Sequence, residues 1–152
     1  MDWKNLFDEK EAQETVGRIK ALTPESQPEW GKMNVSEMLA HCNVAYELVY
    51  TDKHPQPNAI QKFLVQVFAK KIVVGPKPYK KNLRTAPVFL ITDARDFETE
   101  KQRLIEHIGK TQKLGAEHFD RKENHAFGKL NATEWNTMFS KHLDHHLRQF
   151  GV

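Results

Sequence analysis

Apolar residues recur at spacings of three and four in several stretches of the chain, which predicts amphipathic helices. The four main helices are expected from about Trp3 to Leu22, from Asn34 to about Tyr50, from a start near Asp93 or Asp96, and from Asn131 to Phe150. The alternation typical of strands is nearly absent, and Val88 to Ile91 is the one candidate. The pattern therefore predicts an all-α fold.

A long connection separates the second main helix from the third. Its first part, Asn58 to Val74, is apolar enough to predict an extra, buried helix. Its second part, Gly75 to Val88, contains three prolines and is expected to be extended and irregular. Four main helices with one long crossover is an ordinary topology for a four-helix bundle.

Two of the expected helix starts share a motif. GKMNVSE, which begins at Gly31, recurs as GKLNATE, which begins at Gly128. In both, Asn precedes Glu by three residues, as in a capping box whose two side chains satisfy free backbone N–H groups. The motif predicts helices that begin after Asn34 and Asn131.

Length and composition narrow the class of protein. A chain of 152 residues with 39% hydrophobic and 28% charged residues is expected to form one globular domain, residues 1–152. No apolar run approaches the roughly 20 residues that span a bilayer, and the start, MDWKN, lacks a secretory pattern. The single cysteine, Cys42, cannot form an internal disulfide, which favours the cytoplasm. Basic residues cluster only weakly, at Lys70-Lys71 and from Lys77 to Arg84, and the formal charge is +3, so nucleic acid is not expected as a partner. A membrane is not expected either, because no apolar run is long enough to span one.

Three of the eight histidines lie in the last helix. Residues four apart share a helix face, so His142 and His146 can bind one ion together. On a helical wheel this pair lies beside Trp135 and the apolar stripe, whereas His145 falls away from it. His145 is therefore expected to be exposed, or to support the site without binding the metal.

A third histidine, His41, lies on the flank of the second helix's apolar face. At about 1.5 Å per residue it lies about 10 Å from the helix start, while His142 and His146 lie about 12 and 6 Å from their helix end. If the two helices are antiparallel neighbours, the three rings reach the same level. Three imidazoles with open positions are typical of a divalent-metal site. The alternative is a pair of surface histidines without a metal.

These residues belong to longer motifs that resemble a known group of proteins. WGKMNVSEMLAHC (residues 30–42) and the closing HAFGKL (125–130) and KHLDHHLRQFG (141–151) resemble the DinB-like superfamily, which includes the YfiT-like metal-dependent hydrolases. The closing motifs resemble an uncharacterised branch of this superfamily, and NLRTAP (82–87) fits the same branch. The resemblance covers nearly the whole chain.

The resemblance implies a bundle in up-down-down-up order with the crossover between its second and third helices. It places the family's metal ligands at His41, His142 and His146. Relatives bind nickel or zinc, are often homodimers, and include transferases that use low-molecular-weight thiols. A divalent metal, possible use of such a thiol and a small-molecule substrate are therefore expected.

Other polar residues have open roles. His125 belongs to the branch's signature, but a loop imidazole bonded to a backbone carbonyl is an equal alternative to a site role. Asp144 either orients a ligand ring or pairs with Arg148 one turn later. Cys42 is expected to be a core thiol rather than a nucleophile, and Glu47 to be a surface residue.

Two functions follow as hypotheses. The first is a metal-dependent enzyme, a hydrolase or thiol transferase, because a metal held by neutral imidazoles can activate water or a thiol. The second is a non-catalytic, stress-related binding domain in which the metal is structural or absent. No Ser-His-Asp set, phosphate loop or dinucleotide glycine motif competes for the chemistry.

Overall fold

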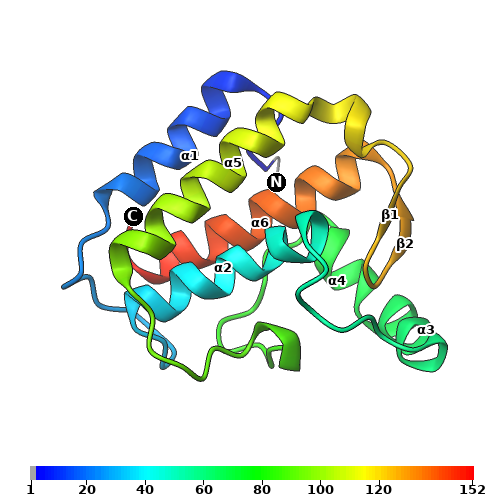
Figure 1. Cartoon of the computed structure of the whole chain (residues 1–152), viewed down its shortest axis with the longest axis horizontal. Coiled ribbons are helices and arrows are strands. Elements are labelled where there is room, and N and C mark those ends of the chain that lie inside the picture. The colour runs from blue at the N-terminus through cyan, green and yellow to red at the C-terminus, as the bar shows by residue number, and fades with distance from the viewer. Residues whose placement is uncertain (1–2) are drawn as a thin grey trace.

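The computed structural model describes residues 3–152 and is mostly helical (Figure 1). Met1 and Asp2 lie outside the described residues. They are the first two residues of the predicted domain and of the MDWKN start. The elements are, in chain order, α1 (Glu9–Ala21), α2 (Val35–Tyr50), α3 (Ala59–Phe68), α4 (Lys70–Val74), the 3-10 helix η1 (Pro87–Phe89), α5 (Phe97–Phe119), β1 (Lys122–Asn124), β2 (Gly128–Leu130) and α6 (Ala132–Gln149).

The four long helices, α1, α2, α5 and α6, lie side by side (Figure 1). α5 packs against α1, α2 and α6, and α6 also contacts α2. Their apolar faces meet in one core whose largest buried side chains include Trp135, Tyr46, Phe119 and Phe139. The chain before α2 meets the end of α6, where Glu29 N–H donates to the Gln149 carbonyl (2.7 Å). The start of α2 is thereby held beside the end of α6.

Both predicted capping boxes are confirmed. Asn34 Oδ1 accepts from Glu37 N–H (2.8 Å), and the Glu37 carboxylate accepts from Asn34 N–H (2.9 Å). Asn131 and Glu134 make the same pair of bonds at 2.9 Å each. A third box, Asn58 with Gln61, starts α3.

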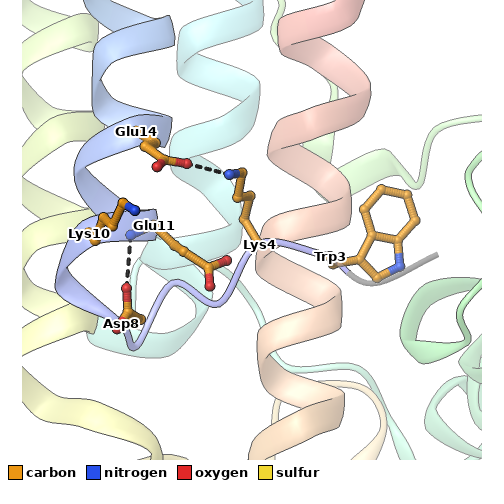
Figure 2. Close-up of a pocket in the computed structure, with 6 residues that line it drawn as sticks. All are labelled: Trp3, Lys4, Asp8, Lys10, Glu11 and Glu14. Carbon is orange, nitrogen blue, oxygen red and sulfur yellow. Dashed lines mark hydrogen bonds and ion pairs between the residues drawn. The ribbon is translucent and has the colours of Figure 1, made fainter.

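The first helix is shorter than predicted. It begins at Glu9, after Asp8 caps it by accepting from Glu11 N–H (3.0 Å; Figure 2). The preceding segment is held in a non-helical path because Asn136 on α6 accepts from Leu6 N–H and donates to the Lys4 carbonyl. Tertiary contacts therefore override the periodicity there. The charged side chains around Asp8 line an open surface hollow that contains no histidine (Figure 2).

The prediction that Asn58 to Val74 is buried is wrong. The segment is helical, as α3 and α4, but no residue of either helix is buried. Its apolar residues follow a helical period, yet no other element covers that face. Periodicity reports that a helix has an apolar side and does not report what packs against it.

The strand prediction is also wrong. Pro87–Phe89 forms a 3-10 turn, and Leu90 and Ile91 are irregular. The described strands are instead β1 and β2, an antiparallel hairpin in which Glu123 pairs with Lys129. Asn124 Oδ1 closes its loop by accepting from two backbone N–H groups, those of Ala126 and Phe127. These strands have three residues each, too few to show alternation.

Glu47, expected at the surface, is 3% exposed. Its carboxylate accepts from Arg103 of α5 and from His54 Nε2 (2.7 Å), and Lys53 lies 3.4 Å away. Although burial alone would raise it, the hydrogen bonds from Arg103 and His54 lower the pKa of Glu47 to about 2. Glu47 is therefore part of an ionic contact between α2 and α5.

Within residues 3–152, no helix combines the length and the apolar character needed to cross a membrane.

Candidate metal centre

α2 and α6 bring His41, His142 and His146 into one cluster. The ring centroids lie 4.9 Å apart for His41 and His142, 4.5 Å for His41 and His146, and 4.9 Å for His142 and His146. The closest nitrogens, Nε2 of His41 and Nε2 of His142, are 2.9 Å apart, and one ligand atom from each ring lies within 4.8 Å of the others. No other His, Cys, Asp or Glu among the described residues joins this group.

The tautomer of His41 is fixed by the crossover. Its Nδ1 lies 2.9 Å from the Phe89 carbonyl oxygen. A carbonyl oxygen can accept but cannot donate, so Nδ1 carries the proton and the Nε2 lone pair faces the cluster. A ring nitrogen oriented in this way could bind a metal ion, with its orienting partner already in place.

The tautomer of His146 is fixed by Gln149, one turn later on α6. The two side chains meet at 2.8 Å, between Nδ1 and Oε1. The amide orientation of Gln149 is defined because its Nε2 donates to the Trp30 carbonyl (2.6 Å). Gly31 permits this contact, because its φ is +84° and a Cβ there would lie 2.5 Å from Gln149 Nε2. His146 Nδ1 therefore donates, and its Nε2 is free to bind a metal.

Burial keeps the three imidazoles neutral. Burial, and then the neighbouring His41 ring, lower the pKa of His146 to about 3. Burial also lowers the pKa of His41, and burial with the adjacent imidazoles lowers the pKa of His142 well below its ordinary range. Neutral imidazole is the form that binds metal ions, so the site is prepared for a cation at neutral pH.

These residues fit a divalent ion of the zinc and nickel type. Two nitrogens that bind one such ion, each about 2.1 Å from it, lie about 3 Å apart in octahedral and about 3.4 Å apart in tetrahedral geometry. The Nε2 atoms of His41 and His142, 2.9 Å apart, are close to the first spacing. The widest separation in the cluster exceeds it, so binding has to draw the three rings closer.

Aromatic side chains from two loops surround the cluster. Phe89 of η1 lies 5.3 Å from His41 and 5.6 Å from His142 between ring centroids. His145 meets His146 edge-on at 5.0 Å and also contacts Trp30 and Tyr79. His145 is thus neither exposed nor part of the triad.

Lys141, next to His142, holds the crossover in place. Its fully buried side chain donates from Nζ to three backbone carbonyls, those of Ile72, Gly75 and Lys77. Burial lowers the pKa of Lys141 to about 8. The crossover that supplies the Phe89 carbonyl is therefore anchored on the same helix that carries two of the histidines.

The remaining sequence candidates lie around the triad or away from it. His125 bonds the Pro55 carbonyl through Nε2 (3.2 Å), the loop contact that was one of its two alternatives. Asp144 pairs with Arg148 and with Arg18 of α1, at 2.8 Å each. Cys42 is buried beside Met38, and burial raises the pKa of its thiol, which confirms a core role.

Sequence reasoning missed the two groups that orient the rings. Gln149 lies three residues after His146, so helical spacing could have revealed it. The Phe89 carbonyl lies 48 residues from His41 and is a backbone atom, so no side-chain pattern signals it.

Fold and site together define a helical protein with a buried three-histidine cluster that could hold a divalent metal ion. Residues 4–151 match the family described as a protein of unknown function (DUF1569), and because the match spans nearly the whole chain, the chain belongs to this family. No curated protein and no solved structure matches it.

Proposed function

We propose that the protein binds one divalent metal ion, nickel or zinc, through His41, His142 and His146, and that it is a metal-dependent enzyme. The observation that carries the proposal is the pair of hydrogen bonds in which Nδ1 of His41 donates to the Phe89 carbonyl and Nδ1 of His146 donates to Gln149 Oε1. These bonds leave the Nε2 lone pairs of both rings for a cation. Such orientation is the usual companion of metal-binding histidines.

We further propose that the chain is a distant relative of the DinB-like superfamily, with an up-down-down-up four-helix bundle. Three observations support this relation. The four long helices pack around one core, the long crossover separates α2 from α5, and α2 begins where α6 ends. The three histidines that the resemblance assigns as metal ligands also form one cluster.

The reaction class we infer is hydrolysis or transfer to a low-molecular-weight thiol. When bound, the metal would supply Lewis acidity, which lowers the pKa of a water molecule or thiol that it contacts. Three neutral ligands, with no carboxylate or fourth ligand beside them among residues 3–152, favour this use, because the ion keeps its charge and an open position. Phe89, Trp30 and Tyr79 would restrict water around a small substrate.

The second candidate is a non-catalytic domain in which a metal ties α2 to α6. The contact of Phe89 with both His41 and His142 favours it, because an aromatic ring against the cluster limits access. An assay of thiol consumption distinguishes the enzyme from the structural domain. Metal-loaded protein is mixed with an electrophile and with glutathione, bacillithiol or mycothiol in turn. Turnover that needs the metal supports the enzyme, and metal binding without turnover of water- or thiol-dependent substrates supports the structural role.

The metal proposal is tested by elemental analysis of protein purified without a His tag. Wild type should carry about one equivalent of nickel or zinc, and His146→Ala should lose it because one of three ligands is gone. Metal at one hundred times its Kd should raise wild-type stability by about 2.7 kcal/mol and leave the variant unchanged. His118→Ala, an exposed histidine of α5, is the control and should bind like wild type. Equal metal content in wild type and His146→Ala would refute the proposal.

A further inference from the structure

The crossover between α2 and α5 concentrates the chain's positive charge. Residues 55–92 contain none of the chain's 20 acidic residues and seven of its 23 basic ones: Lys62, Lys70, Lys71, Lys77, Lys80, Lys81 and Arg84. The rest of the chain has more acidic than basic residues. The formal charge of the whole chain is only +3 because acidic residues elsewhere offset the seven positive charges of this segment.

The same segment carries nearly all the large apolar side chains that the described residues expose. Eight of nine lie in it: Ile60, Phe63, Leu64, Val67, Phe68, Ile72, Leu83 and Leu90. The first six are 47 to 73% exposed. Five of them follow the i, i+3, i+4, i+7, i+8 spacing along α3, so they form a continuous apolar strip.

The strip faces away from the protein. α3 projects from the four long helices (Figure 1). Its attachments are polar: Lys62 pairs with Glu123 (2.9 Å), and Lys70, at the start of α4, lies 3.7 Å from Glu134. The other five basic residues of the segment make no ion pair with any described residue, and one of them, Lys81, lies over the Trp30 ring (4.1 Å). The segment thus presents an exposed apolar strip on α3 and basic side chains that carry no acidic partner.

We propose that residues 55–92 dock the protein on the surface of a lipid bilayer that contains anionic lipids, with α3 lying in the interface. An apolar helix face buries itself at the boundary of headgroups and acyl chains, and neighbouring lysines are attracted to anionic headgroups. Surface binding needs no spanning helix, and the described residues contain none.

The charge of the segment favours a lipid surface over a second copy of the chain as its binding partner. A symmetric dimer through α3 would place one basic segment against another that equally lacks acidic residues. Like charges across a contact oppose association. An anionic surface instead neutralises the lysines while it covers the apolar strip.

The test is co-sedimentation of the full-length protein with vesicles. Vesicles of phosphatidylcholine mixed with phosphatidylserine should bind the protein, and phosphatidylcholine alone should bind it at least about fivefold more weakly, since each basic residue near an anionic surface contributes roughly a fivefold gain. Added salt should weaken the binding because it screens the charges.

Two variants separate the apolar and the charged contributions. Phe63→Gln with Phe68→Gln, and Lys71→Glu with Lys80→Glu, should each weaken binding by roughly tenfold or more. All four residues are exposed, so circular dichroism should show that the variants keep the wild-type helix content. The matched controls lie on α5, outside the segment: Leu114→Gln and Lys113→Glu should bind like wild type.

Failure of wild type to bind anionic vesicles would overturn the proposal, and so would equal losses in the α5 controls. Sedimentation velocity identifies the rival occupant. A concentration-dependent dimer that Phe63→Gln with Phe68→Gln abolishes, without vesicle binding, would assign the strip to self-association. Metal content is measured in the same preparations and should be the same in wild type and in these variants. The membrane proposal and the metal proposal are therefore tested independently.

Discussion

At the scale of single residues, the two hydrogen bonds that orient the histidines differ in how they can be probed. The partner of His41 is a backbone carbonyl, which survives any substitution at Phe89. The partner of His146 is a side-chain amide, itself held by the Trp30 carbonyl. Gln149 is therefore the position where ring orientation can be changed without removing a ligand.

Gln149→Leu keeps the size of the side chain and removes both hydrogen bonds. We expect metal affinity to fall by about 10- to 100-fold, the usual cost of losing a group that orients a ligand. Stability should fall by about 1 to 2 kcal/mol because the Trp30 carbonyl loses its partner. Isothermal titration with zinc and urea denaturation measure the two effects. Gln112→Leu on α5 is the control, and an unchanged zinc affinity in Gln149→Leu would show that the bond does not prepare the site.

At the scale of elements, the site depends on two helices that each begin with the same capping box. α2 supplies one ring and α6 supplies two; α2 is buried on all sides from Met38 to Glu47, and α6 buries half of its residues. α3 begins with an equivalent box but packs no residue into the core. The three caps are therefore the same local structure in different tertiary settings.

Alanine at these caps should have unequal effects. Asn34→Ala and Asn131→Ala should each cost about 1 kcal/mol, which lowers the melting temperature by about 2 to 4 °C in a chain of this size. Asn58→Ala should leave the melting temperature nearly unchanged, because fraying of α3 is a local event outside the cooperative core. Calorimetry measures the first effect, and amide exchange in α3 measures the second. Equal melting shifts for the three variants would contradict this division.

At the scale of the whole molecule, a polar contact joins the two helices on either side of the crossover. Glu47 of α2 and Glu100 of α5 share Arg103, and Asn43 donates to the Glu100 carboxylate (2.8 Å). Asn43 also accepts from His107 at 2.9 Å. Buried charges need such partners, so removing one member leaves the others unsatisfied.

The stability of the whole chain should fall with acid through Glu47. Its pKa is about 2 when folded and near 4.5 in the unfolded chain, so between these values the unfolded state binds more protons. The contribution is thus complete above pH about 5 and lost as the pH falls toward 2. Glu47→Gln should lower the free energy of unfolding by about 2 kcal/mol at pH 7, and the difference from wild type should shrink toward pH 2.

Denaturant unfolding at several pH values, with the exposed Glu117→Gln as control, measures this dependence. A difference between wild type and Glu47→Gln that stays constant from pH 7 to pH 2 would exclude the linkage.

Local signals explain why much of the architecture was predictable. The boundaries of α2 and α6 follow from Asn34 and Asn131, because a cap is a contact between residues three apart. The matching depth of His41, His142 and His146 followed from helical spacing and rise, which any α-helix obeys. Their meeting also needed the two helices to be antiparallel neighbours, which was expected only from the family resemblance. The early start given to α1 failed because Asn136, far along the chain, holds the preceding segment.

The sequence by itself determined the main helices, the caps of the second and last of them, and the helix faces on which His41, His142 and His146 lie, because each depends on covalent neighbours and backbone geometry. Only the tertiary structure decided that α3 stays uncovered, that Glu47 is buried against Arg103, and that His41 Nδ1 donates to the Phe89 carbonyl. Those outcomes depend on which segment fills the space beside a given side chain. Packing between distant segments decides which segment fills that space, and the periodic pattern of one segment does not identify its neighbour.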